Sequence, residues 1–144
     1  MQRAKRKEYL LHMFHEETLI RKTFGMKLAY DEEDRAIVTL PFNPALTHSQ
    51  GIHGGIYATL LDTAGWFASA VRHGESQWVT TSEMSIHFLR PAMETELKAV
   101  GSILKKGKRQ DIVEMRLYDS AGELVGHAVG TFQLIQQSPP ATQG

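Results

Sequence analysis

The residues best suited to chemistry are His53, the pair Gly54-Gly55 and Asp62. Asp62 is the only formally charged side chain between residues 36 and 71, and an isolated carboxylate in so apolar a segment is unfavourable unless it is paired, protonated or solvated in a cleft. Paired glycines allow close approach to the backbone, and N–H groups at a helix start suit a developing oxyanion. The segment predicts a carboxylate working with a backbone oxyanion site. The structural alternative is a glycine turn and an ordinary ion-paired aspartate.

A buried helix must position these groups. Apolar residues recur at helical spacing from residue 54 to about residue 72, with few polar side chains between them, which predicts a helix buried on most sides. Asp62 follows Gly55 by seven residues, or about two turns, so both lie on the same helix face. Gly74 ends the segment.

The other elements form a sheet around this helix. Residues 3–22 have the pattern of an amphipathic helix, and residues 26–30 and 35–40 that of a hairpin, whereas residues 41–53 read as irregular. Alternating patterns after the helix predict strands over residues 78–89, 96–105, 110–118 and 123–134. We expect an α+β domain over residues 1–135, an antiparallel sheet wrapped around one buried helix, and a disordered tail over residues 136–144.

Composition excludes several classes of protein. The 144 residues suffice for one domain, and sixteen basic residues balance sixteen acidic ones, so no net charge favours nucleic acid or anionic membranes. The chain has no cysteine, which excludes disulfides, thiolate metal sites and cysteine nucleophiles. Prolines and glycines interrupt the longest charge-poor stretch, so we expect no membrane span and a cytoplasmic protein.

Residues 51–64, GIHGGIYATLLDTA, resemble the signature of the hotdog-fold acyl-CoA thioesterases of the phenylacetate-degradation (PaaI-like) group. That signature has a histidine, two glycines and an aspartate nine residues after the histidine. The likeness includes residues 40–44, 81–92 and 105–108, and it spans roughly residues 24–134. It implies the hotdog fold, in which a curled sheet encloses one long helix.

The resemblance also implies catalytic roles. The Gly54 N–H would polarise the thioester carbonyl, and Asp62 would act as nucleophile or as the general base for water. His53 would hold the loop and the thioester end, and Thr81 would orient the water or the carboxylate. In this family the aspartate faces the motif of a neighbouring subunit, so the resemblance implies a homodimer, or a homotetramer built from two dimers, with a shared site.

This chain departs from the family pattern at one place. Many members carry an asparagine five or six residues before the motif histidine, where this sequence has His48 and Thr47. Because an imidazole can donate or accept a hydrogen bond, His48 is a candidate to take over that role. The alternative is that His48 is an ordinary loop histidine with no role in the site.

Substrate-binding candidates flank these positions. Gly55 lies beside the expected oxyanion donor. Of the apolar residues near the expected cleft, Phe88 among them, we assign most to the core and one or two to the acyl pocket, for which Trp66, one turn past Asp62, is the best candidate. Candidate cations for the phosphates of coenzyme A are Arg90, Lys105, Lys106, Lys108 and Arg109, although such a basic turn can equally be a solvated one.

We therefore predict an acyl-CoA thioesterase that needs no metal and no cofactor, coenzyme A being part of the substrate. One alternative is a hotdog enoyl-thioester hydratase or dehydratase, which hydration of an enoyl thioester would reveal. Another is a non-catalytic acyl-CoA-binding module, which binding without turnover would reveal.

Overall fold

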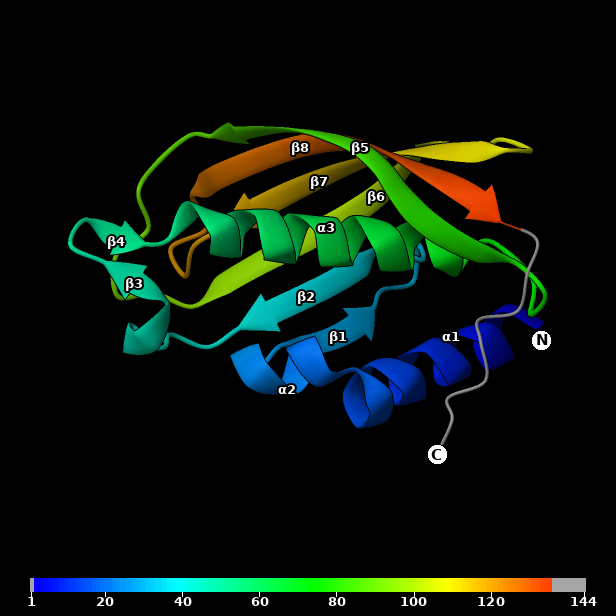
Figure 1. Ribbon diagram of the computed structural model, residues 1–144, viewed down its shortest axis with the longest axis horizontal. Helices are drawn as coiled ribbons and strands as arrows, with labels where there is room; N and C mark the ends of the chain where they lie inside the picture. Colours follow the sequence, from blue (N-terminus) through cyan, green and yellow to red (C-terminus); the bar gives the residue numbers. More distant parts are fainter. Residues whose placement is uncertain (1, 136–144) are drawn as a thin grey trace.

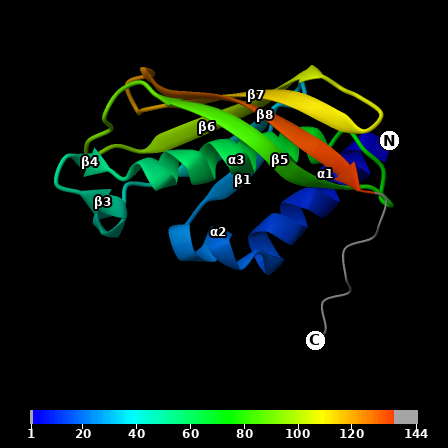
Figure 2. The same ribbon diagram turned by 45° about the horizontal axis from the view of Figure 1, so that its top comes forward.

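The computed structural model describes residues 2–135, so the predicted tail lies outside the described residues. One six-stranded antiparallel sheet has the strand order β1-β2-β6-β7-β8-β5 and curls around helix α3 (Gly54–Ala70), as Figures 1 and 2 show. The strands are β1 (Lys27–Tyr30), β2 (Ala36–Leu40), β5 (Trp78–Phe88), β6 (Leu97–Lys105), β7 (Gln110–Tyr118) and β8 (Leu124–Ile135). The predicted α+β hotdog architecture is confirmed.

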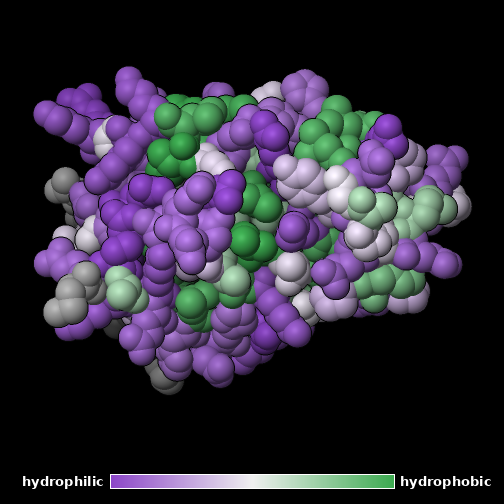
Figure 3. Space-filling view, turned by 180° about the vertical axis from the view of Figure 1, so that it is seen from behind, coloured by the Kyte–Doolittle hydropathy of each residue, from purple (hydrophilic) through white to green (hydrophobic). Residues whose placement is uncertain are grey.

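Helix α3 lies against the concave face of the sheet at close range. A Cβ at Gly101 of β6 would lie 2.4 Å from the Ala64 carbonyl oxygen, so only glycine allows the backbones to approach this closely. The side chains of β2 alternate between Ala36, Val38 and Leu40, which are buried, and more exposed residues on the other face. Seen from behind, the molecule is mostly hydrophilic with separate apolar patches (Figure 3).

The N-terminal segment is not the single helix that the sequence predicts. It consists of α1 (Gln2–His12), a π-helical turn η1 (Met13–Glu17) and α2 (Leu19–Phe24), with Thr18 extended between the last two. Leu10 and Phe14 are buried as expected, whereas Leu19 is 75% exposed. The break at Thr18 turns α2 away from the core, so the apolar spacing does not continue along one face.

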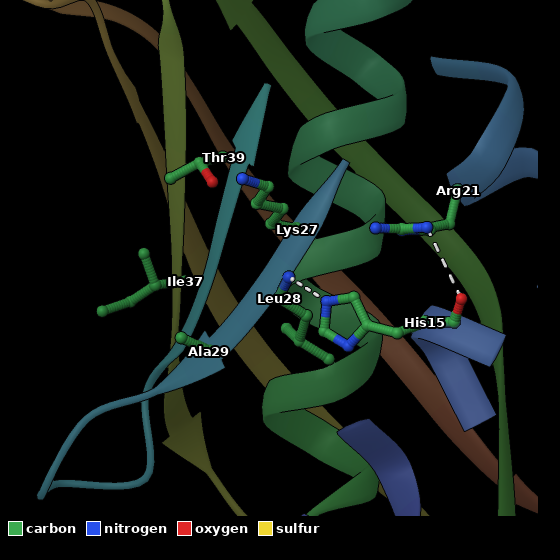
Figure 4. A pocket seen from close by; sticks show the side chains of 7 residues that line it. All are labelled: His15, Arg21, Lys27, Leu28, Ala29, Ile37 and Thr39. Atoms are coloured by element: carbon green, nitrogen blue, oxygen red, sulfur yellow. Dashed lines mark hydrogen bonds between the residues drawn. The ribbon is translucent and has the colours of Figure 1, made fainter. Parts of the chain in front are cut away.

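The π-helical turn carries His15, whose imidazole contacts two backbone groups. Its Nδ1 lies 2.8 Å from the Leu11 carbonyl oxygen, and its Nε2 accepts the Leu28 N–H of the edge strand β1 at 3.1 Å (Figure 4). The π-helical turn thus presents the imidazole to a backbone group thirteen residues along the chain. His15 and Leu28 also line an open pocket of about 590 Å³ over β1 and β2.

A short hairpin replaces part of the predicted irregular segment 41–53. The 3₁₀ helix η2 (Pro44–Leu46) leads into β3 (Thr47–His48), which pairs with β4 (Gly51–Ile52). The Ile52 N–H donates to the Ala92 carbonyl at 2.8 Å, which ties this hairpin to the loop after β5. Two-residue strands carry too little periodicity to be recognised in a sequence.

A buried polar cluster holds the C-terminal end of α3 in place. Asp111 of β7 is fully buried, and it accepts hydrogen bonds from Ser69 Oγ at 2.7 Å and from the Gly107 N–H at 3.1 Å, while His73 Nε2 lies 2.6 Å from its Oδ2. Burial raises the pKa of the Asp111 carboxyl, but the hydrogen bonds from His73, Ser69 and Gly107 outweigh it and hold the pKa below its usual value. Both Ser69 and His73 bind the carboxylate, so the trio lacks the serine–histidine bond of a hydrolytic triad.

We expect Asp111→Asn to lower the free energy of unfolding by about 3 kcal/mol at neutral pH, because it leaves buried donors without their charged acceptor. Since the folded-state pKa is depressed, the carboxylate stabilises the fold fully above about pH 5 and loses this effect as the pH falls through the folded value. Urea unfolding should therefore show that the difference in free energy of unfolding between the parent and the variant becomes smaller towards pH 3. A difference that grows on acidification would contradict this role of Asp111.

Candidate active site

The first turn of α3 carries a free backbone donor. His53 is the N-cap: its Nδ1 accepts the Gly55 N–H at 2.8 Å and its carbonyl accepts the Ile56 N–H at 2.9 Å. Within the described residues, the Gly54 N–H has no acceptor. A helix N-terminus with one uncommitted N–H has the geometry of an oxyanion donor.

A pocket of about 340 Å³ opens in front of this donor. Its wall includes Gly54 with His48 and Gln50 from the loop before α3, and Phe88 and Arg90 from the end of β5 and beyond. The Tyr57 hydroxyl donates to the Arg90 carbonyl at 2.7 Å and so joins α3 to this wall. The pocket therefore contains three predicted site residues, together with Gln50, which had no signal in the sequence.

Phe88 belongs to the group of apolar residues that we expect near the cleft, most of them in the core and one or two in the acyl pocket. It is 57% exposed and its ring lies on Gly54, where an added Cβ would be 3.2 Å from Phe88 Cε1. Phe88 is the last residue of the edge strand β5, so the sheet ends before it can cover the ring. The ring instead forms part of the pocket wall.

Asp62 is oriented by Thr81. The Thr81 hydroxyl donates to Asp62 Oδ1 at 2.7 Å, and both side chains are half-buried. Thr81 sits where the pairing of β5 with β8 shifts register, and such a bulge redirects side chains. The structure thus joins two residues, nineteen positions apart, that the resemblance assigns to one site with different roles.

Asp62 and Gly54 do not meet within one chain. They are eight residues apart on α3, a rise of about 12 Å along the helix axis. A carbonyl within hydrogen-bond distance of the Gly54 N–H is therefore out of reach of the Asp62 carboxylate of the same chain.

His48 lies close to His53 but faces the solvent. The two ring centroids are 6.0 Å apart, and His48 Nδ1 accepts the Gln50 N–H at 2.9 Å. Because each histidine uses Nδ1 as an acceptor, the neutral tautomer of each carries its proton on Nε2. Each ring then offers one N–H donor beside the pocket.

Trp66 lies on the same side of α3 as Asp62. Its Nε1 donates to the Val79 carbonyl of β5 at 2.9 Å, and its ring packs edge-on against Trp78 at 4.8 Å between centroids. The indole is half-buried and held in one orientation. It is well placed to bound a site that includes Asp62.

The cationic candidates separate into two places. Arg90 is exposed next to the Gly54 pocket, 3.6 Å from Glu123. The basic turn between β6 and β7 lies at the other end of α3, because its Gly107 N–H binds Asp111, the partner of Ser69 and His73. Its exposed members are Lys105, Lys106, Lys108 and Arg109. Within one chain this turn is remote from Gly54.

Two features are absent from residues 2–135. No group of three or more acidic or histidine side chains there is arranged to hold a metal ion. No helix in that part of the chain is both long and apolar enough to cross a membrane.

Comparison with known proteins identifies the family. The family model described as the thioesterase superfamily matches residues 50–125, which include the helix start and Asp62. The chain belongs to the thioesterase superfamily. The thioesterase is also 32% identical, over 83% of its length and 79% of the relative's, to a Saccharolobus solfataricus protein named "Putative esterase SSO1253".

Solved structures support the same relationship. The thioesterase superposes on the Escherichia coli PaaI protein with a TM-score of 0.82 at 23% identity, covering 92% of this chain and 96% of the other. BH2602 from Bacillus halodurans, solved with CoA, has a TM-score of 0.79 at 33% identity and covers 90% of this chain and 88% of its own. The predicted thioesterase family and thioester hydrolase activity are confirmed, and the PaaI protein shares the fold.

Proposed function

We propose that this thioesterase hydrolyses an acyl- or aryl-CoA thioester to the free acid and coenzyme A, using Gly54 of one subunit and Asp62 of another. The observation that carries the proposal is the uncommitted Gly54 N–H at a helix N-terminus that opens into a pocket. In the reaction a water oxygen adds to the carbonyl carbon, the C–S bond breaks, and the proton from water ends on the thiol. The carbonyl oxygen is negative in between, and the Gly54 N–H stabilises it.

Asp62 supplies the second half of the chemistry. Its carboxylate either takes the proton of the attacking water or attacks the carbonyl itself, and Thr81 Oγ holds Oδ1 in place at 2.7 Å. His53 keeps the helix start in position through its bond to the Gly55 N–H. His48 and Gln50 border the entrance, and the proposed role of His48 is to donate a hydrogen bond from Nε2 to the thioester end or the water.

Two subunits are needed because about 12 Å of helix separates the two groups in one chain. Strand β5 is eleven residues long and lies at the end of the sheet, where one edge has no partner within the described residues. Pairing of two β5 edges would continue the sheet and satisfy their backbone groups. We propose a dimer in which α3 helices run antiparallel, so that each Asp62 faces the partner's helix start; a dimer of dimers remains a prediction.

We propose coenzyme A as part of the substrate because BH2602, which is 33% identical to this chain, was solved with CoA. Arg90 is the cation next to the Gly54 pocket, and Trp66 is the proposed wall for the acyl group.

Thiol release from a panel of aryl- and alkyl-acyl-CoAs tests the proposal. We expect saturable release of free thiol with at least one member, together with the matching acid. An enoyl-CoA should be included, because hydration without thiol release would favour a hydratase. Tight binding of the panel without turnover would contradict the hydrolytic proposal.

A further inference from the structure

A second pocket lies at the opposite end of α3 from Gly54. It has a volume of about 670 Å³ and is formed between α1 and the segment that joins α3 to β5. This volume is typical of small-molecule sites. None of its residues belongs to the pocket around Gly54.

Four cationic side chains line the second pocket. These cations are Arg3, Lys5, Arg6 and Arg72. Among the described lining residues, Glu75 is the only acidic one. Arg3 is paired with Asp34 at 2.7 Å, whereas Lys5 is exposed and forms no ion pair with any residue from 2 to 135. The pocket therefore has a positive excess that suits an anion.

Two of these arginines are held in place by backbone carbonyls. Arg6 is buried, and it donates from Nε to Ala70 O at 3.2 Å and from Nη2 to Gln77 O at 3.3 Å. Arg72 donates from Nη2 to Glu33 O at 3.1 Å, while its buried Nε has no partner among the described residues. No carboxylate of residues 2–135 contacts either arginine directly, so both offer their charge to a ligand.

An exposed aromatic ring completes the wall. Tyr9 is 49% exposed and lines the pocket, with the Arg6 guanidinium 5.8 Å from its ring centroid. An exposed ring next to cations can stack on a planar base while the cations bind its phosphates. This combination selects a nucleotide over a simple anion.

The basic turn between β6 and β7 adds to the same end of the molecule. His73 lines the pocket and contacts Asp111 at 2.6 Å, and Asp111 accepts the Gly107 N–H from that turn at 3.1 Å. The buried carboxylate thereby joins the basic turn to the pocket wall. The four cations of the turn are exposed.

We propose that this pocket binds the adenosine bisphosphate end of the substrate's coenzyme A. The inference rests on the proposed function, because the thioester must lie at Asp62. Ala70, whose carbonyl holds Arg6, lies eight residues beyond Asp62, about 12 Å along α3. An extended pantetheine arm can span this distance, so the phosphates reach Lys5, Arg6 and Arg72 while the carbonyl is at the partner's Gly54.

Calorimetric titration with adenosine 3′,5′-bisphosphate tests the pocket directly and without turnover. We expect binding that weakens with salt and becomes about tenfold weaker in Lys5→Glu, because a cation–phosphate contact is lost. Lys22→Glu, an equal charge change on an exposed α2 residue outside the pocket, should bind as the parent does. Arg72→Gln provides a second variant at the pocket. No binding by the parent, or equal loss in the Lys22 control, would overturn the proposal.

Kinetics show whether the bound nucleotide is the substrate's own. Lys5→Glu should raise KM for an acyl-CoA about tenfold with kcat unchanged, and it should leave KM for the matching acyl-pantetheine, which lacks the nucleotide, unaltered. An equal rise with both substrates, or none with either, would overturn the assignment. If instead the proposed thioesterase chemistry is wrong, the parent will turn over neither substrate but will still bind adenosine 3′,5′-bisphosphate in the calorimeter.

Discussion

Replacement of Gly54 by proline is expected to lower kcat by about 10²–10³-fold, because it removes the N–H that stabilises the oxyanion. Gly54 is the first residue of α3, and proline is well tolerated there. His53 has φ −59° and ψ 137°, a conformation that is compatible with a following proline. Steady-state thiol release and circular dichroism would separate the loss of activity from a loss of fold.

Gly54→Ala is the matched control. It places the same Cβ against the Phe88 ring, 3.2 Å from Cε1, but it keeps the backbone N–H. We expect the alanine variant to retain far more activity than the proline variant. Equal losses in the two would assign the effect to contact with Phe88, and a fully active proline variant would refute the oxyanion role of Gly54.

Asp62→Asn is expected to lower turnover by at least roughly 10²-fold while the fold is kept, because the amide can neither deprotonate water nor attack the carbonyl. The asparagine oxygen can still accept the Thr81 hydroxyl, so the local geometry is preserved. An Asp62→Asn protein that turns over at the parent rate would exclude the carboxylate from the reaction.

Mixed dimers test whether the site is shared. Each single variant, Asp62→Asn and Gly54→Pro, should be inactive alone, but a heterodimer contains one site that combines an intact Gly54 with the partner's intact Asp62. Random assortment makes half of the dimers mixed, so co-refolding equal amounts should restore about a quarter of the parent activity. No recovery, despite exchange of subunits shown by a tagged chain, would place both groups in one site within a chain.

The sequence by itself determined the central helix and the chemistry at its start. The helical spacing of apolar residues in 54–70 and the glycine pair at their start are local signals, so α3 could be predicted almost to the residue. The isolation of the Asp62 charge is also a local feature of the sequence, and it indicated a special environment for this carboxylate. Alternating patterns likewise placed β7 at its observed bounds.

Only the tertiary structure decided which of these residues meet. Strand order and register are set by long-range pairing, which a period of two does not encode, and they bring Thr81 to Asp62 and leave Phe88 exposed beside Gly54. The break in the N-terminal helix occurs where His15 Nε2 accepts the Leu28 N–H, a contact outside any local pattern. The position of the basic turn at the far end of α3, next to a cationic pocket, follows from the burial of Asp111 against Ser69 and His73.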